Sequence, residues 1–245
     1  MATAVDMHGA MEGSFAGSAV VSMRAFYDAM PRQPRAEWPR MMHGMGYNFE
    51  FYDALFALVL AHVQLSFDDG DYTPRHEAMQ AALVPFCSEF GIELRKDLER
   101  SHRSLYAEFF RVATGSVMPE RYPKDDRNPW LTASRRWAER MRSRLAPADG
   151  SIDRARYALG YLWAVERLSV DEFTMMRAAW HRAGVGAAYL DAHCAVEEDH
   201  DAFATRALLA FASPDEPLVR QAIRDHEDDL GGYYRELTTL LCALA

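Results

Sequence analysis

The stretch "YLDAHCAVEEDHDAF", residues 189–203, crowds two imidazoles and several carboxylates into one predicted helix. At about 100° of rotation per residue, His193, Glu197 and His200 fall within about 60° of one another on a single face. The neighbouring acid Glu198 points elsewhere and is expected to be a solvated charge. Imidazole nitrogen and carboxylate oxygen together suit iron, manganese or zinc. One helix face cannot complete a coordination sphere, so the stretch is either a polar stripe on a surface helix or part of a metal site to which other segments contribute ligands.

A second candidate ligand, Glu166, lies in "ALGYLWAVERLSV", where almost every neighbour is apolar. A carboxylate in such surroundings is costly unless it is paired, hydrogen-bonded or bound to a metal. Arg167 or another arginine is an alternative partner for it. A helical hairpin with its turn near residues 183–186 would bring Glu166 within a turn or two of the level of Glu197. The two carboxylates are thus expected to share one site.

Further candidates lie upstream, where Glu99 and His102 in "DLERSHRSLY" are spaced i and i+3 and share a helix face. This spacing is one way in which a helix gives two ligands to a dinuclear centre. Glu89, in "CSEFG", is a further carboxylate and stands just before a glycine. Three separate segments therefore bring carboxylates and imidazoles inward, a combination typical of iron sites.

Composition and charge narrow the class of protein. The chain has 245 residues, 49% of them hydrophobic, and can bury a large core. Its net charge of -9 argues against nucleic acid or an anionic membrane as a partner, so a small-molecule substrate is expected. The three cysteines form no CxxC pair, which favours a reducing, cytoplasmic compartment. The longest apolar run, residues 54–67, is too short to span a bilayer. Both a monomer and a homodimer are compatible with these features.

The chain reads as helix after helix, without the alternation typical of strands. Residues 1–18 are predicted to be a flexible tail, residues 19–245 a single all-α domain, and residues 31–47 a proline-rich loop within it. The predicted helices cover about residues 19–30, 48–69, 73–91, 93–115, 130–146, 151–183, 186–212 and 215–244.

The segments "SEFG", "SHRSLYAEFFRVATG", "ALGYLWAVE" and "YLDAHCAVEEDH" together resemble the heme-oxygenase-like diiron oxidases and oxygenases. These are seven-helix relatives of heme oxygenase and of the TenA thiaminases. The resemblance covers about residues 48–212 and implies an all-α, heme-oxygenase-like bundle that holds two irons and uses O2 as a cosubstrate. The implied ligands are Glu89 or Glu99 as the bridging carboxylate, His102, Glu166, His193 and Glu197, with His200 as a ligand or a residue that supports one.

The sequence departs from the family pattern at three places. The gap between Glu89 and His102 is longer than the pattern has, so Glu99 stays a candidate. The family usually has aspartate where Glu197 stands, a change of one methylene group. It also has a carboxylate near residues 63–66 of the first core helix, where this sequence has none. The candidates that remain open for the first-helix ligand are His62, Gln64, Asp68 and Asp69.

The resemblance implies an oxidase or oxygenase of specialised metabolism that acts on a small amino acid, amine or fatty-acid-like substrate. The outcome would be C–H or C–C cleavage or N-oxygenation. The ligand spacing is also similar to the arylamine N-oxygenases, whose fold is a ferritin-like four-helix diiron bundle.

Three further kinds of protein are compatible with the sequence. One is a metal-independent enzyme like TenA or PqqC, with a catalytic cysteine or histidine in its pocket. Another is a non-catalytic helical binding protein. The third is heme oxygenase itself, which would need a proximal histidine, for which His43 is the candidate.

Overall fold

The computed structural model describes residues 9, 11–92, 100–124, 127–186 and 188–244. Within these ranges the regular structure is helical, which confirms the all-α prediction. The longer helices are α2 (Ser18–Ala29), α3 (Trp38–Leu65), α4 (Tyr72–Glu89), α5 (His102–Thr114), α6 (Pro129–Leu145), α7 (Ile152–Arg182), α8 (Ala188–Phe211) and α9 (Pro217–Leu244).

Several helix boundaries follow from capping residues in the sequence. Ser101, Asn128 and Ser151 each accept a hydrogen bond from a backbone N–H in the first turn of α5, α6 and α7. Such caps satisfy amides that have no partner inside the helix. Gly115 ends α5 in the left-handed region with φ of 71°, as its sequence position predicted.

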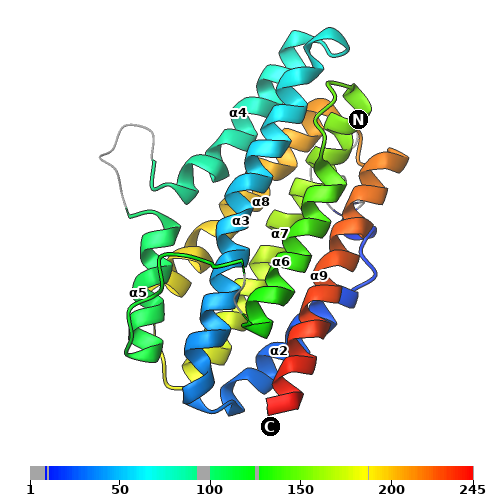
Figure 1. Cartoon of the computed structure of the whole chain (residues 1–245). Helices are drawn as coiled ribbons and strands as arrows, with labels where there is room; N and C mark the ends of the chain where they lie inside the picture. Colours follow the sequence, from blue (N-terminus) through cyan, green and yellow to red (C-terminus); the bar gives the residue numbers. More distant parts are fainter. Residues whose placement is uncertain (1–8, 10, 93–99, 125–126, 187, 245) are drawn as a thin grey trace.

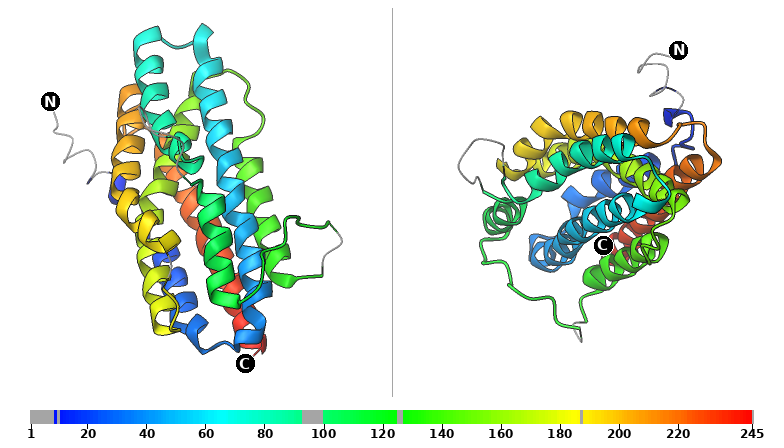
Figure 2. Two further views of the ribbon diagram at one scale, coloured as in Figure 1. Left: turned by 90° about the vertical axis from the view of Figure 1, so that its left-hand side faces the viewer. Right: turned by 90° about the horizontal axis from the view of Figure 1, so that it is seen from above.

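Helices α3 and α7 occupy the centre of the bundle (Figure 1). α3 packs against α4, α5, α6 and α7, whereas α7 packs against α2, α3, α8 and α9. The views in Figure 2 show the long helices running side by side, with α4 covering one end of α3 and α5 lying beside its other half. By length and composition alone, the segment of residues 35–68 is apolar enough to cross a membrane.

Helix α3 begins at Trp38, ten residues before the predicted start near residue 48. The prediction of a loop over residues 31–47 is therefore wrong from Trp38 onwards. Pro39 does not interrupt the helix because it stands in the first turn, where the amide has no helical partner to lose. Residues 30–32 and 35–37 form short 3-10 turns that lead into α3.

Two glycines inside α3 allow neighbouring helices to approach closely. A Cβ atom added to Gly44 would lie 2.5 Å from Cβ of Trp130 and 2.6 Å from the backbone nitrogen of Leu131. One added to Gly46 would lie 2.7 Å from the ring of Tyr106. Both distances are too short for real atoms, so α6 and α5 can pack on α3 at this level only because side chains are missing here.

The segment that precedes α2, predicted to belong to a flexible tail, packs on the bundle from Met11 onwards. Met11 is fully buried. The backbone N–H groups of Ala16 and Ser18 each donate to the carboxylate of Glu227 on α9, at 2.7 Å. The packed domain thus starts earlier than residue 19. The remainder of the predicted tail, residues 1–8 and 10, lies outside the described residues.

We expect Gly44→Ala to lower the free energy of unfolding by about 1–3 kcal/mol, because the new methyl group meets the backbone of α6 rather than a flexible side chain. Urea denaturation measures the change. Gly232→Ala in α9 is the matched control, since no atom lies closer than 3.8 Å to its new Cβ. In the control, the free energy of unfolding should rise by up to about 1 kcal/mol, because alanine has a higher helix propensity than glycine. Equal effects of the two substitutions would contradict the close packing at Gly44.

Candidate metal centre

The predicted face of α8 points into the bundle. His193, Glu197 and His200 are each 4% exposed, whereas Glu198 and Asp199 between them are exposed. The prediction that helical periodicity made for this stretch is therefore confirmed.

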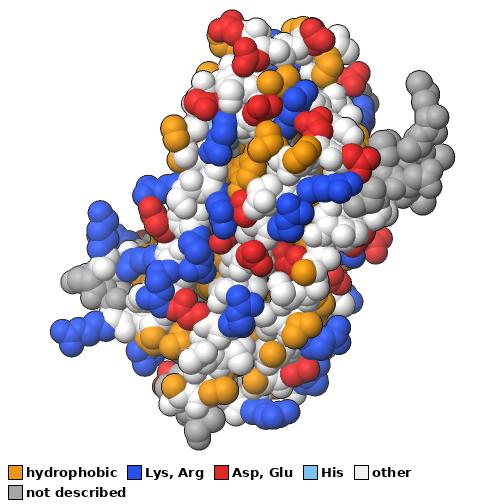
Figure 3. All heavy atoms as spheres, turned by 90° about the vertical axis from the view of Figure 1, so that its right-hand side faces the viewer, with side chains coloured by type: hydrophobic (Ala, Val, Ile, Leu, Met, Phe, Trp, Pro, Cys, Tyr) orange, Lys and Arg blue, Asp and Glu red, His pale blue; other side chains and the backbone are white. Residues whose placement is uncertain are grey.

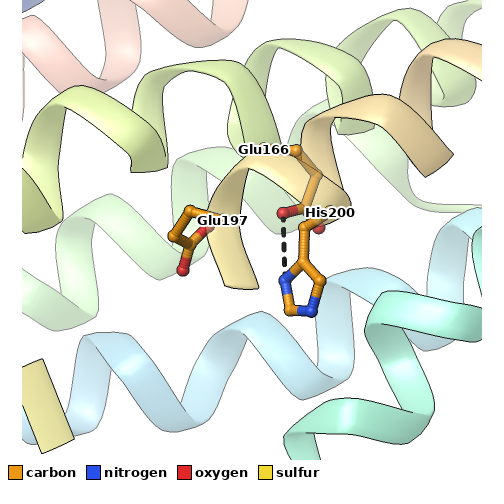
Figure 4. A group of neighbouring side chains, drawn as sticks. All are labelled: Glu166, Glu197 and His200. Atoms are coloured by element: carbon orange, nitrogen blue, oxygen red, sulfur yellow. Dashed lines mark ion pairs between the residues drawn. The ribbon is translucent and has the colours of Figure 1, made fainter. Parts of the chain in front are cut away.

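Glu166 of α7 meets this face from the neighbouring helix (Figure 4). Each of Glu166, Glu197 and His200 offers one atom that could bind a metal ion, and these three atoms lie within 4.8 Å of one another. Nδ1 of His200 is 3.7 Å from Oε2 of Glu166. Arg167 does not neutralise Glu166, because it pairs with Glu12 and Asp171 instead. The expectation that α7 and α8 bring these carboxylates together is met.

His193 continues the cluster on its other side. Its Nδ1 is 2.9 Å from Oε1 of Glu197. Its ring stacks on Phe173 of α7 with the centroids 3.9 Å apart and the planes 2° apart, which fixes the orientation of the imidazole. The ring centroid of His102 lies 4.1 Å away. The α5 histidine therefore reaches the same site as the α8 histidine.

Glu89, the last residue of α4, faces His102, the first residue of α5, with 2.7 Å between Oε2 and Nδ1. Arg100 and Ser101 are not helical, so the helix predicted from about residue 93 begins only at His102. The prediction that one helix carries both Glu99 and His102 on the same face therefore does not hold, and Glu99 itself lies outside the described residues.

The acid that α3 presents to this group is Asp53, which was not predicted from the sequence. It lines the same pocket as Glu89 and His102. Burial and the nearby Glu89 carboxylate raise the pKa of Asp53 to about 6. The pattern that pointed to Glu166 could also have pointed to Asp53, because Asp53 is an acid among mostly apolar neighbours in "FEFYDALFAL".

The four candidates for the first-helix position lie elsewhere. His62 is buried, but its Nε2 contacts the carbonyl of Leu145. Gln64, Asp68 and Asp69 are exposed. None of the four lines the pocket. Asp53, a half-buried acid of α3 that lines the pocket, lies about ten residues before the position expected for this carboxylate.

Burial dominates the electrostatics of the cluster. It raises the pKa values of Glu166 and Glu197 well above the usual range, and the charge of Glu89 raises both further. Burial also lowers the pKa of His193 well below its usual value, and that of His200 to about 4. Without a cation, burial therefore favours the protonated form of the two acids and the neutral form of the two imidazoles. A bound metal ion supplies the positive charge that permits the carboxylates to ionise.

Three buried atoms of the cluster make no hydrogen bond within the described structure: Oε1 of Glu166, Oε2 of Glu197 and Nε2 of His193. Leaving such polar atoms buried without a partner costs free energy. Metal coordination would satisfy them, and a set of carboxylate oxygens and imidazole nitrogens suits iron. The residues present therefore fit a metal ion.

A pocket of about 680 Å³, which includes space open to solvent, adjoins the cluster. Phe49, Phe56, Val165 and Phe173 form apolar parts of its wall. None of the three cysteines, all in the described ranges, lines it. His43 does not line it either, because the His43 ring stacks on Tyr122.

Glu172 is a further buried acid in the pocket wall that was not predicted from the sequence. The hydroxyl of Tyr234 donates a hydrogen bond to its carboxylate, and the hydroxyl of Tyr27 lies 2.8 Å from that of Tyr234. Burial raises the pKa of Glu172 to about 7. The carboxyl can therefore exchange a proton with the pocket near neutral pH.

The raised pKa of Glu172 makes stability depend on pH. Folding raises this pKa from 4.5 to about 7, so the folded state keeps a proton that the unfolded state releases. Glu172 therefore lowers the free energy of unfolding as the pH rises from about 4.5 to about 7, by on the order of 3 kcal/mol in total. We expect wild-type protein without metal to lose more stability than Glu172→Gln between about pH 5 and about pH 8, as measured by urea denaturation. Parallel stability curves for the two proteins would argue against the raised pKa.

Comparison with known structures identifies the fold. Two crystal structures of a CADD-like protein of unknown function from Nostoc punctiforme PCC 73102, at 2.00 and 1.35 Å resolution, superpose with TM-scores of 0.64 and 0.66. The identities are 17% and 16%, over 91% and 89% of this chain and 87% and 86% of theirs. The predicted heme-oxygenase-like bundle is confirmed, and the ferritin-like four-helix bundle is set aside.

A search of curated proteins finds no significant match. A family model described as "iron-containing redox enzyme" matches residues 47–226, which include Asp53 and all the described ligand candidates. This is well over half of the 245 residues, and the chain therefore belongs to the family of iron-containing redox enzymes.

Proposed function

We propose that this protein is a non-heme diiron enzyme that uses O2 to oxidise or oxygenate a small organic substrate. The observation that carries the proposal is the convergence of carboxylates and imidazoles from α3, α4, α5, α7 and α8 on one pocket. Membership of the iron-containing redox family supports iron as the metal.

The arrangement offers two neighbouring positions for metal ions. Glu166, Glu197 and His200 form one group, with ligand atoms within 4.8 Å of one another. Glu89 and His102 form the core of the second, with Asp53 and His193 beside them. Glu197 belongs to the first group and also contacts His193. Glu197 would therefore help to hold metal at both positions, a role that the sequence resemblance implied for Glu89 or Glu99.

Bound iron would supply the electrons and the oxidising power for the reaction of O2 with the substrate. The protein's own part is to hold the ligands, exclude water and manage protons. Stacking of Phe173 on His193 keeps the imidazole in place, and the apolar wall with Phe49 and Val165 limits the access of water. Glu172, with its pKa of about 7, can deliver or accept a proton at its carboxyl oxygen.

We also propose that the protein works on a small molecule rather than on nucleic acid. The net charge is -9, and the face seen in Figure 3, on the α9 side of Figure 1, mixes basic with acidic side chains. Three arginines of the basic helix α6 are paired across to α9: Arg136 with Glu236, Arg140 with Asp229 at 3.9 Å, and Arg144 with Asp229 at 3.2 Å. Paired arginines leave little positive field to attract phosphates.

Anaerobic loading with Fe(II) should give about two irons per chain, the number that the proposed carboxylate-rich bundle site holds. Glu166→Ala and His193→Ala should each bind at least one iron fewer and lose O2-dependent turnover, while helical content by circular dichroism stays nearly unchanged. Iron analysis after gel filtration measures the stoichiometry.

Glu198→Ala and Asp199→Ala are the controls, since both residues are exposed on the same helix as His193. They should keep wild-type iron content and activity. If Glu166 and His193 instead served only as a buried structural group, their removal would cost about 3–5 kcal/mol of stability and leave iron bound. That result, or the absence of specific iron uptake by the wild type, would overturn the proposal.

A further inference from the structure

An ion pair stands at the open side of the pocket. Arg103, which directly follows His102 on α5, pairs with Glu50 of α3, and both residues line the pocket. Their side chains are 37% and 35% exposed, against 3% and 5% for Glu166 and Glu197. The pocket therefore has an outer end with two opposite charges and an inner end with the ligand cluster.

The ion pair uses only part of each charged group. The described contacts of the Arg103 guanidinium, to Glu50, Met118 and Tyr122, all involve Nη1. Those of Glu50, from Arg103 and Tyr122, all involve Oε1. Nε and Nη2 of Arg103 and Oε2 of Glu50 thus have no partner among the described residues. The free edge of a guanidinium can bind a carboxylate through two parallel hydrogen bonds.

The charges of the pocket restrict what can occupy this end. Among the described residues that line the pocket, Arg103 is the only lysine or arginine. A ligand carboxylate is therefore drawn to Arg103, and an ammonium on the same head group can reach Glu50, the acid that pairs with Arg103. A carboxylic acid alone would compete with Glu50 for the arginine, and an amine alone would compete with the arginine for Glu50. A head group with both charges satisfies both partners at once.

The wall between the two ends is aromatic. Phe49 contacts Tyr106 at 5.3 Å and Phe173 at 6.0 Å between ring centroids. Phe173 in turn stacks on His193 of the ligand cluster. An apolar side chain that starts at the ion pair would follow this wall toward the metal ligands.

We propose that the substrate is an α-amino acid whose carboxylate binds Arg103 and whose ammonium binds Glu50, with an apolar side chain directed at the metal centre. The inference rests on the proposed function for the chemistry at the inner end, and it adds the substrate class and the residues that recognise it. The atoms that react then belong to the side chain of the amino acid, because its charged head group is held at the outer end.

Binding by calorimetry tests this inference on anaerobic Fe(II)-loaded protein and on metal-free protein. The ligands are the standard amino acids with apolar or aromatic side chains. For each amino acid that binds, the panel adds the acid without its amino group and the amine without its carboxylate. We expect each truncated analogue to bind at least about tenfold more weakly than its parent, since one charged contact is lost.

Two substitutions separate the charged contacts. Arg103→Gln should weaken the amino acid and its deaminated analogue about tenfold or more, and should not weaken the decarboxylated amine, which no longer competes with the arginine for Glu50. Glu50→Gln should weaken the amino acid and the decarboxylated amine, and should not weaken the deaminated analogue. Arg111→Gln is the matched control, because Arg111 lies on the same helix and pairs with Glu108 outside the pocket. It should bind every ligand as the wild type does.

Arg103→Lys is a second variant in case the glutamine variant does not fold. It keeps the charge but loses the two parallel hydrogen bonds, so it should weaken carboxylate binding by a smaller factor. Unchanged amino acid binding by the folded Arg103 variants, or no binding of any amino acid in the panel, would overturn the inference. Iron content is measured in the same samples, so a failure of the metal centre is recognised separately from a failure of the head-group site.

Discussion

The burial of Glu166 and Glu197 between α7 and α8 is the constraint on which the rest of the structure depends. Both carboxylates are almost inaccessible, and no arginine or lysine is paired with either in the described structure. Ionised carboxylates in such a place are stable only with a compensating positive charge. The chain provides imidazoles that burial keeps neutral, so the compensation has to come from protons or from a metal cation. A family of iron enzymes is where such an arrangement is expected.

The opposite wall of the site is positioned by irregularities of the helices. Glu89 and His102 face each other because α4 ends and α5 begins at these residues, and a continuous helix would have separated them by more than three turns. Asp53 reaches the same pocket from α3. The N-terminal half of α3 lies close to α5 and α6 because Gly44 and Gly46 carry no side chain. The second half of the candidate site therefore depends on helix ends and close crossings.

This difference explains how much of the molecule could be predicted from the sequence. The face of α8 and the buried place of Glu166 were predictable, because both follow from periodicity and from local apolar neighbours. The pairing of Glu89 with His102 was not, since it depends on where α5 starts, and the predicted helix from about residue 93 ran through the capping residue Ser101. The packed segment before α2 was also missed, because its partner Glu227 lies about 210 residues away in the chain and leaves no local pattern.

The polarity of the pocket has a chemical consequence. A free carboxylate that reached the ligand cluster would itself coordinate the metal, because it offers the same oxygen ligands as Glu166 and Glu197. The arginine of the pocket lies at the outer, more exposed end, where charges are cheaper to keep than in the interior. A carboxylate held there by Arg103 is kept away from the metal, and the aromatic wall admits the apolar part of the ligand instead. At the proposed metal site, the separation of charges along the pocket would thus decide which end of a ligand meets the metal.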